Sequence, residues 1–132
     1  MGVESTKENV ASFKTPNQMC LEICFDPSSR LVAVGTADSH VKVYDVSKQF
    51  QTHNFLGHRG VICKLAFMPG VDTFKLVSAA EDFNVKVWDL VLNKEIANLK
   101  GNKGRVSSLL FTRDFRTMIV GSRDGLIVLY NA

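Results

Sequence analysis

Three side chains in the middle of the sequence have the types that serine hydrolases use for catalysis: His58, Ser78 and Asp82. A histidine that is held by a carboxylate can take the proton of a serine hydroxyl and make that oxygen a nucleophile. However, Ser78 lies inside an apolar run that is typical of a strand, and no loop suited to an oxyanion hole accompanies it. We therefore expect no catalytic residues in this chain.

The three cysteines, Cys20, Cys24 and Cys63, are the other reactive side chains, and their odd number gives no paired disulfide framework. Cys20 and Cys24 would lie about 13 Å apart along a strand, which is too far for a disulfide. The sequence has no CxxC pair and no histidine at ligand spacing, so we expect neither a metal nor a cofactor. The thiols are predicted to be small buried groups in a reducing compartment.

A repeated pattern surrounds these residues. The segments 31–45, 76–89 and 118–131 resemble one another, and a fixed period of this kind determines the architecture. In each segment an acidic turn residue is followed six positions later by an aromatic residue, and the copies are 44 and 42 residues apart. The acidic residues are Asp38, Asp82 and Asp124, and the aromatic residues are Tyr44, Trp88 and Tyr130.

Short runs of Val, Ile, Leu and Phe between Pro, Gly, Asp, Ser and Asn turns indicate strands throughout. No stretch has the 3.6-residue apolar period of a helix. We expect first strands at 20–25, 61–67 and 106–111, second strands at 31–35, 74–79 and 117–122, third strands at 41–45, 85–90 and 126–130, and outer strands at 50–56 and 95–100.

Units of about 40–45 residues with four strands are typical of propeller blades. The sequence therefore predicts an all-β fold of three consecutive four-stranded antiparallel blades in an incomplete propeller, with units at about 16–56, 57–100 and 101–132 after a disordered segment 1–8. Segment 9–15 is expected to be the outer strand of an earlier blade, and the third unit stops before its own outer strand. Both ends are thus expected to lie inside a larger periodic object, whose open flanks would favour self-association.

The dipeptides Gly57–His58 and Trp88–Asp89 make the chain resemble the WD-repeat family. In that family a Trp, a Ser or Thr, an Asp and a His form a hydrogen-bonded chain across the blade, and such a network satisfies polar groups that are buried. The resemblance implies a structural tetrad in the second unit, made of His58, Ser78, Asp82 and Trp88. The other units depart from this pattern through Val34, Val120, Asn102 and the two tyrosines, although Asp38 and Asp124 can still cap their turns.

Charged residues gather in the loops that should share one rim of the propeller. The net charge is only +3, from 16 basic and 13 acidic side chains, so charge alone neither requires nor excludes an RNA partner. Because four of the five rim residues are basic, they suit a phosphate or an acidic segment of a partner, and the alternative is that they are merely solvated. These rim residues are Arg59, Glu81, Lys103, Arg105 and Arg123.

A closer resemblance rests on the sequence Thr-His-Asn-Phe at 52–55, between Tyr44–Asp45 and the Gly57–His58 and Gly60–Val61 pairs. This arrangement is similar to the transducin beta-like WD-repeat proteins of the small-subunit processome. The resemblance implies a nucleolar scaffold that assembles with other protein subunits, and with an RNA-containing complex, in small ribosomal subunit biogenesis and pre-rRNA processing. The alternative is a WD-repeat adaptor of another complex, such as a splicing factor or a ubiquitin-ligase substrate receptor.

No apolar run approaches the roughly 18 residues that span a bilayer, so we expect no membrane partner. Gly2 and Thr6 match the short N-myristoylation pattern, but no polybasic patch follows them to strengthen a single acyl anchor. The sequence leaves that modification open.

Overall fold

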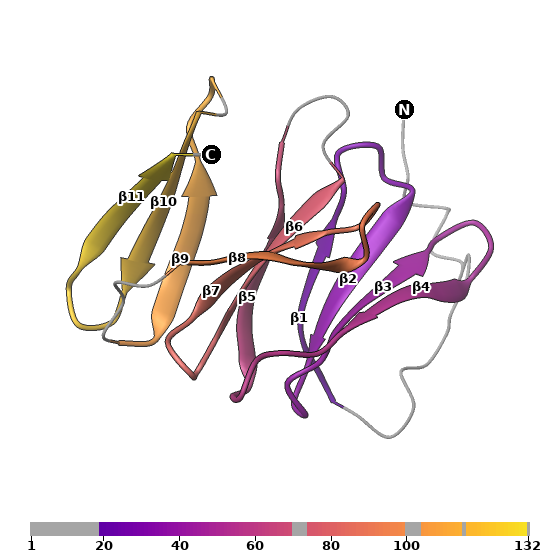
Figure 1. Ribbon diagram of the computed structural model, residues 1–132, viewed down its shortest axis with the longest axis horizontal. Coiled ribbons are helices and arrows are strands. Elements are labelled where there is room, and N and C mark those ends of the chain that lie inside the picture. Colours follow the sequence, from indigo (N-terminus) through magenta and orange to yellow (C-terminus); the bar gives the residue numbers. More distant parts are fainter. Residues whose placement is uncertain (1–18, 70–73, 100–103, 115, 132) are drawn as a thin grey trace, which may run out of the picture.

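The computed structural model describes residues 19–69, 74–99, 104–114 and 116–131, which form strands and turns and contain no helix. Three antiparallel sheets stand side by side along the molecule (Figure 1). The first sheet contains β1 (Cys20–Phe25), β2 (Leu31–Thr36), β3 (Val41–Asp45) and β4 (Phe50–Phe55). The second contains β5 (Ile62–Phe67), β6 (Lys75–Ala80), β7 (Val85–Asp89) and β8 (Lys94–Leu99), and the third contains β9 (Val106–Phe111), β10 (Thr117–Ser122) and β11 (Ile127–Asn131).

This arrangement confirms the predicted all-β fold of consecutive propeller blades. Each expected strand is present, and its ends differ from the prediction by at most one residue. In each sheet, neighbours in sequence are neighbours in space, and in the described residues the third sheet consists of three strands. The segments 1–8 and 9–15, predicted as disordered and as an outer strand, lie outside the described residues. No described segment forms a helix long and apolar enough to cross a membrane.

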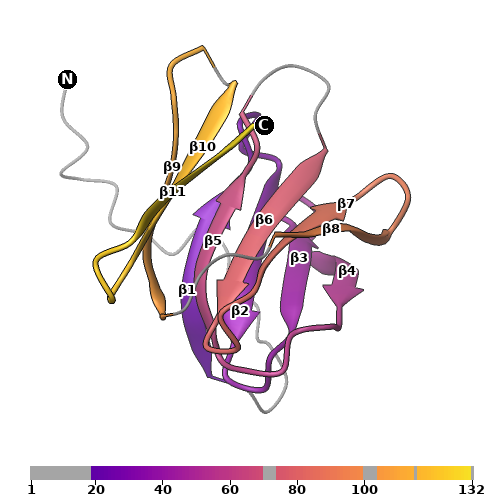
Figure 2. The same ribbon diagram turned by 60° about the vertical axis from the view of Figure 1, so that its left-hand side comes forward.

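The first strands of successive sheets are neighbours, with β5 between β1 and β9 (Figures 1 and 2). An apolar cluster fills each of the two spaces between sheets. Val41, Val43 and Phe55 of the first sheet pack against Leu65 and other residues of the second. A second cluster joins the second sheet to the third; it includes Val77, Val85, Cys63, Val106 and Met118.

The first sheet leaves one face uncovered. In the second sheet, Leu65 and Phe67 face the preceding sheet and are 6% and 8% exposed. Ile23 and Phe25 occupy the same register positions on β1 and are 62% and 59% exposed. We call the surface around Ile23 and Phe25 the leading face.

The third sheet has the opposite uncovered face. Val85 and Val87 of the second sheet face the third and are 0% and 9% exposed. Their counterparts on β11, Ile127 and Leu129, are 66% and 64% exposed. With the exposed Leu110 they form what we call the trailing face, which has the apolar character of a surface that packs against another sheet.

The cysteines follow the prediction only in part. Cys63 is buried, and burial raises the pKa of the partly buried Cys24 thiol to about 12. Cys20 is exposed, so the prediction of a buried thiol is wrong there. The reason is its place at the start of the leading sheet: its counterparts Ile62 and Val106 are covered by the sheet before them, whereas in the described residues no sheet precedes β1.

Candidate functional site

A chain of hydrogen bonds crosses the second sheet. The indole N–H of Trp88 donates to Ser78 Oγ over 2.7 Å, and Ser78 Oγ lies 2.7 Å from His58 Nε2. His58 Nδ1 lies 3.1 Å from a carboxylate oxygen of Asp82. Because the ionised carboxylate of Asp82 can only accept, the hydrogen of a neutral His58 lies on Nδ1 and is donated to Asp82, and Nε2 then accepts the hydroxyl hydrogen of Ser78. The structure thus brings all four residues of the implied tetrad together.

Asp82 ends this chain in the turn between β6 and β7. Its carboxylate accepts hydrogen bonds from the backbone N–H groups of Arg59, at 2.9 Å, and Asn84, at 3.0 Å. Burial alone would raise the pKa of Asp82, but these two bonds and the bond from His58 outweigh it and lower the pKa. Asp82 is therefore a charged anchor that ties the Gly57–Gly60 loop to the turn.

The same geometry resembles a Ser–His–Asp catalytic triad, so the surroundings of the serine are decisive. Ser78 is completely buried inside β6, and its oxygen already accepts the indole N–H of Trp88. A substrate carbonyl has no route to this hydroxyl in the folded state. The arrangement satisfies buried polar groups, as the tetrad interpretation requires, and provides no accessible nucleophile.

Aromatic stacking extends this network into the first sheet. The ring of Phe55 stacks on Trp88 at a centroid distance of 4.8 Å, and His53 stacks on Phe55 at 5.5 Å. His53 Nε2–H donates to the carbonyl oxygen of Leu90 over 2.8 Å, while Thr52 Oγ1 donates to the Val43 carbonyl. The Thr-His-Asn-Phe segment therefore fastens the outer strand of one blade to the next blade.

The buried imidazole predicts a dependence of stability on pH. Burial lowers the pKa of His58 despite its bond to Asp82, so the folded state favours neutral His58, whereas an unfolded histidine titrates near 6.5. As the pH falls from about 7 to about 5, the unfolded state binds more protons, and the free energy of unfolding should fall by at most about 1.4 kcal/mol per pH unit.

Urea unfolding at several pH values measures this slope. The control is His58→Asn, which introduces the residue type that the third unit carries and cannot titrate. This variant should lose most of the slope, and an unchanged slope would show that other groups cause it.

The turns of the first and third sheets use a different partner for their aspartates. Thr36 Oγ1 donates to Asp38, and Ser122 Oγ donates to Asp124, so both aspartates cap their turns. The sequence interpretation considered the hydroxyl position at Val34 and Val120 and missed Thr36 and Ser122. The signal was a Ser or Thr two residues before each aspartate, a spacing typical of local side-chain caps.

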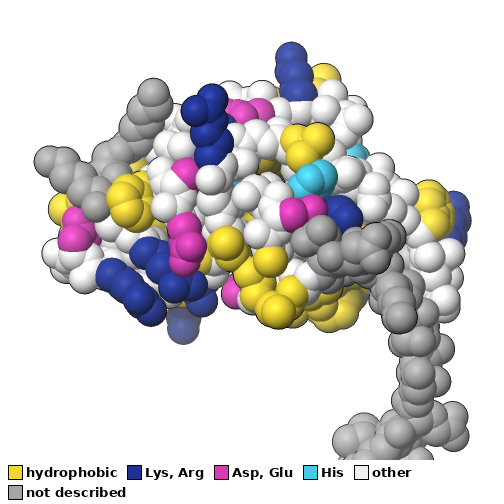
Figure 3. Space-filling model, turned by 90° about the horizontal axis from the view of Figure 1, so that it is seen from below, with side chains coloured by type: hydrophobic (Ala, Val, Ile, Leu, Met, Phe, Trp, Pro, Cys, Tyr) yellow, Lys and Arg dark blue, Asp and Glu magenta, His cyan; other side chains and the backbone are white. Residues whose placement is uncertain are grey.

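The rim residues are only partly brought together. Arg105 Nη1 lies 3.5 Å from Glu81 Oε1, and the backbone N–H of Arg123 donates to the Arg105 carbonyl over 2.9 Å. Arg59 is exposed in the Gly57–Gly60 loop, beside Asp82. Lys103 lies outside the described residues. Figure 3 shows Lys and Arg side chains gathered at the end of the molecule that carries the third sheet.

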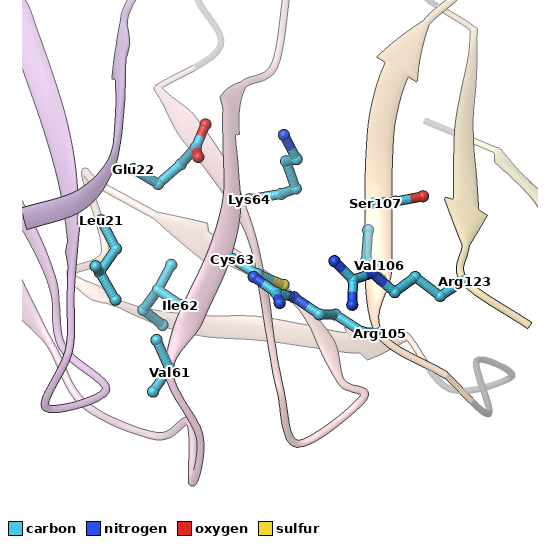
Figure 4. A pocket seen from close by; sticks show the side chains of 10 residues that line it. All are labelled: Leu21, Glu22, Val61, Ile62, Cys63, Lys64, Arg105, Val106, Ser107 and Arg123. Carbon is cyan, nitrogen blue, oxygen red and sulfur yellow. The ribbon is translucent and has the colours of Figure 1, made fainter.

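A pocket of about 350 Å³ lies beside these arginines, between the beginnings of the three first strands. Figure 4 shows Arg105 and Arg123 extending from the third sheet towards Cys63 on β5. We call it the inner pocket; its lining is Leu21, Glu22, Val61, Ile62, Cys63, Lys64, Arg105, Val106, Ser107 and Arg123. Sequence reasoning missed Glu22 and Lys64, because only the register of neighbouring sheets reveals that they face the same space as the arginines.

Successive four-stranded blades and a Trp–Ser–His–Asp network define a class of protein, the repeat-built β-propellers. The family described as "WD domain, G-beta repeat" matches residues 7–45, 49–89 and 93–131. These matches cover most of the chain, which therefore belongs to this family.

Several curated proteins are similar to this chain. Transducin beta-like protein 3 of Bos taurus is 37% identical over 109 residues, which are 83% of this chain and 14% of that protein. Periodic tryptophan protein 2 homolog of Dictyostelium discoideum is 32% identical over 126 residues, covering 92% of this chain and 13% of that protein. Protein MAK11 of Saccharomyces cerevisiae is 29% identical over 131 residues, covering 83% and 31%. The chain thus spans about a seventh of the first two relatives.

Proposed function

We propose that this chain is a non-catalytic scaffold whose blades hold the surfaces of partner macromolecules. The observation that carries the proposal is the contrast between the tetrad and the rim. Ser78 and His58, which have catalytic potential, are buried and bonded to each other, whereas the described charged residues of the rim are exposed or partly exposed in the loops beside the strand ends. Rigid blades with exposed loops are suited to binding, because a scaffold of strands positions the loop side chains.

We further propose that the assembly it joins is the small-subunit processome and that its place is the nucleolus. The support is the resemblance of the Thr-His-Asn-Phe segment to transducin beta-like proteins of that complex, together with the similarity to Transducin beta-like protein 3. The partners would be other protein subunits of the assembly, and pre-rRNA contact is part of the proposal.

Affinity purification of the tagged chain from growing cells tests this assignment. We expect enrichment of pre-rRNA, of small nucleolar RNA and of ribosomal precursor proteins over a tagged control protein of similar charge. Enrichment of splicing or ubiquitin-ligase subunits in their place would overturn the ribosomal assignment and support an adaptor role in another complex.

A second copy of the chain is the partner that we propose for the leading and trailing faces. Inside the chain, residues equivalent to the trailing face of one sheet pack against residues equivalent to the leading face of the next sheet. Val41 and Val43, for example, share a cluster with Leu65 and Phe67. The leading face of one copy should therefore fit the trailing face of another as the sheets of one copy fit each other.

This pairing predicts concentration-dependent self-association. Light scattering at increasing protein concentration should give a mass above 14.6 kDa, and Leu129→Asp, which places a charge on the trailing face, should return the chain to a monomer. The control is Val91→Asp, because Val91 is 75% exposed in the turn between β7 and β8, on neither face. A monomeric wild type, or equal association of the two variants, would contradict the proposal.

A further inference from the structure

One backbone hydrogen bond recurs at the same place in all three sheets. It joins the first residue after the second strand to the residue just before the first strand, and it holds the rim together at that point. The bonds run from Ala37 N–H to the Met19 carbonyl, from Glu81 N–H to the Val61 carbonyl and from Arg123 N–H to the Arg105 carbonyl, with N···O distances of 3.1, 2.9 and 2.9 Å.

We call this backbone hydrogen bond the clamp, and the residue types that form it differ from sheet to sheet. The first sheet carries methionine and alanine, the second carries valine and glutamate, and only the third carries an arginine at both positions. The blade fold therefore does not require a basic side chain here. A basic residue at both positions is thus specific to the third sheet, and the hydrogen bond between their backbones places Arg105 and Arg123 side by side.

The environment of the two arginines leaves their charge largely uncompensated. Arg105 faces Glu81 at 3.5 Å, but both side chains are about two-fifths exposed, and a pair of this kind contributes little. Within the residues that the structure describes, Arg123 forms no ion pair. Lys64 adds a third cation to the inner pocket, and Glu22 is the one carboxylate of its lining. The inner pocket is therefore a basic site.

The inner pocket also offers apolar surface. Leu21 is 41% exposed and Val61 is partly exposed, whereas Ile62, Cys63 and Val106 are buried beneath them by the packing of neighbouring sheets. A volume of about 350 Å³ accommodates a few side chains and is at the lower end of the range for small binding sites. The combination suits a ligand with a carboxylate and an adjacent apolar group.

We propose that the inner pocket binds an acidic peptide segment of a protein partner. Arg105 and Arg123 hold a carboxylate of the segment with charge-assisted hydrogen bonds, and a neighbouring apolar side chain packs against the accessible Leu21 and Val61. A single-stranded RNA is the less suitable ligand, because such sites combine cations with aromatic rings for base stacking, and no aromatic side chain lines this pocket. The inference rests on the proposed scaffold function and names the kind of partner that one of its surfaces takes.

The sister sheets supply variants that keep the blade intact. Arg105→Met combined with Arg123→Ala installs the residues of the first sheet at the clamp and removes both guanidinium groups. The matched control is Arg113→Met combined with Arg116→Ala, which removes the same charge at the other end of the third sheet, where the first of these arginines is exposed between β9 and β10.

Fluorescence anisotropy with a labelled peptide of alternating glutamate and leucine measures the binding. The pocket variant should weaken binding about tenfold or more, the control variant should leave it nearly unchanged, and the peptide with glutamine in place of glutamate should bind about as weakly as the pocket variant. Equal loss in both variants, equal binding of the glutamine peptide, or no binding to the wild type at about 1 mM peptide would overturn the inference.

A labelled uridine decamer tests RNA as the alternative ligand of the inner pocket. If the RNA binds more tightly than the peptide and loses its affinity in the pocket variant, the site is an RNA site and the inference is wrong. The result is separable from that of the purification test, because peptide binding in vitro does not depend on which cellular assembly the chain joins.

Discussion

Replacement of Trp88 by alanine is expected to lower the free energy of unfolding by about 3–5 kcal/mol. The indole is 2% exposed, stacks on Phe55 of the first sheet and donates its N–H to Ser78. The variant loses the packing of the indole between the first two sheets, and it loses the N–H that donates a hydrogen bond to the buried Ser78 hydroxyl. Urea unfolding followed by far-ultraviolet circular dichroism measures the change, since Trp88 is the single tryptophan and its fluorescence disappears with it.

A second variant keeps part of the packing. Trp88→Phe leaves an aromatic ring against Phe55 but removes the N–H donor and part of the indole volume, so we expect a loss of about 1–3 kcal/mol, smaller than that of the alanine variant. This variant should stay folded even if the alanine variant does not. A loss below about 1 kcal/mol for alanine would mean that the stacking between the first two sheets does not contribute to stability as the geometry indicates.

Alanine at Gly35 is expected to destabilise the contact between the first two sheets by about 1–3 kcal/mol. A methyl group there would lie 2.4 Å from Cγ2 and 2.7 Å from Cβ of Ile62. Rotation of the Ile62 side chain could move Cγ2 but not Cβ, which is bonded directly to the backbone. The equivalent contact between the second and third sheets has side chains of other sizes. There the larger Ala79 occupies the position of Gly35, and the smaller Val106 occupies the position of Ile62. Glycine with isoleucine and alanine with valine are thus two versions of one interface.

The matched control is Gly121→Ala, at the register position of Gly35 on the third sheet. A methyl group there meets only Ser108 at 3.7 Å, an ordinary contact, so stability should hardly change. The double variant Gly35→Ala with Ile62→Val should be less destabilised than the sum of the two single variants. Calorimetry of the wild type, Gly35→Ala, Ile62→Val and the double variant measures the coupling between the two positions. Strict additivity of the changes in stability would contradict this account of the interface.

The repeat period made most of the fold predictable. Asp82 and Trp88 have counterparts at 42 and 44 residues, and each copy needs the same turn and the same strands around it, so the strand bounds followed from sequence alone. Contacts between copies were not predictable in this way. The clash at Gly35 depends on which side chain the next sheet presents, and the exposure of Cys20 depends on the absence, in the described residues, of a sheet before β1.

The inner pocket shows the same limit. Arg105 and Arg123 were visible in the sequence as rim charges, but Lys64 and Glu22 lie inside strands and gave no sign that they share a space with them. Their convergence follows from the side-by-side placement of β1, β5 and β9 (Figure 1). Function at such a site therefore depends on the positions of several blades and not on a linear motif.

The apolar clusters between sheets join only neighbouring blades, and this has a consequence for how the molecule opens. In such a quasi-one-dimensional structure, the resistance of each unit to local unfolding is its own stability plus the coupling to its neighbours. The second sheet packs against a neighbouring sheet on both of its faces, whereas each outer sheet packs against a neighbour on one face. Amide hydrogens on β6 and β7 should therefore be the last to exchange with solvent, and unzipping should proceed from the outer sheets towards the middle.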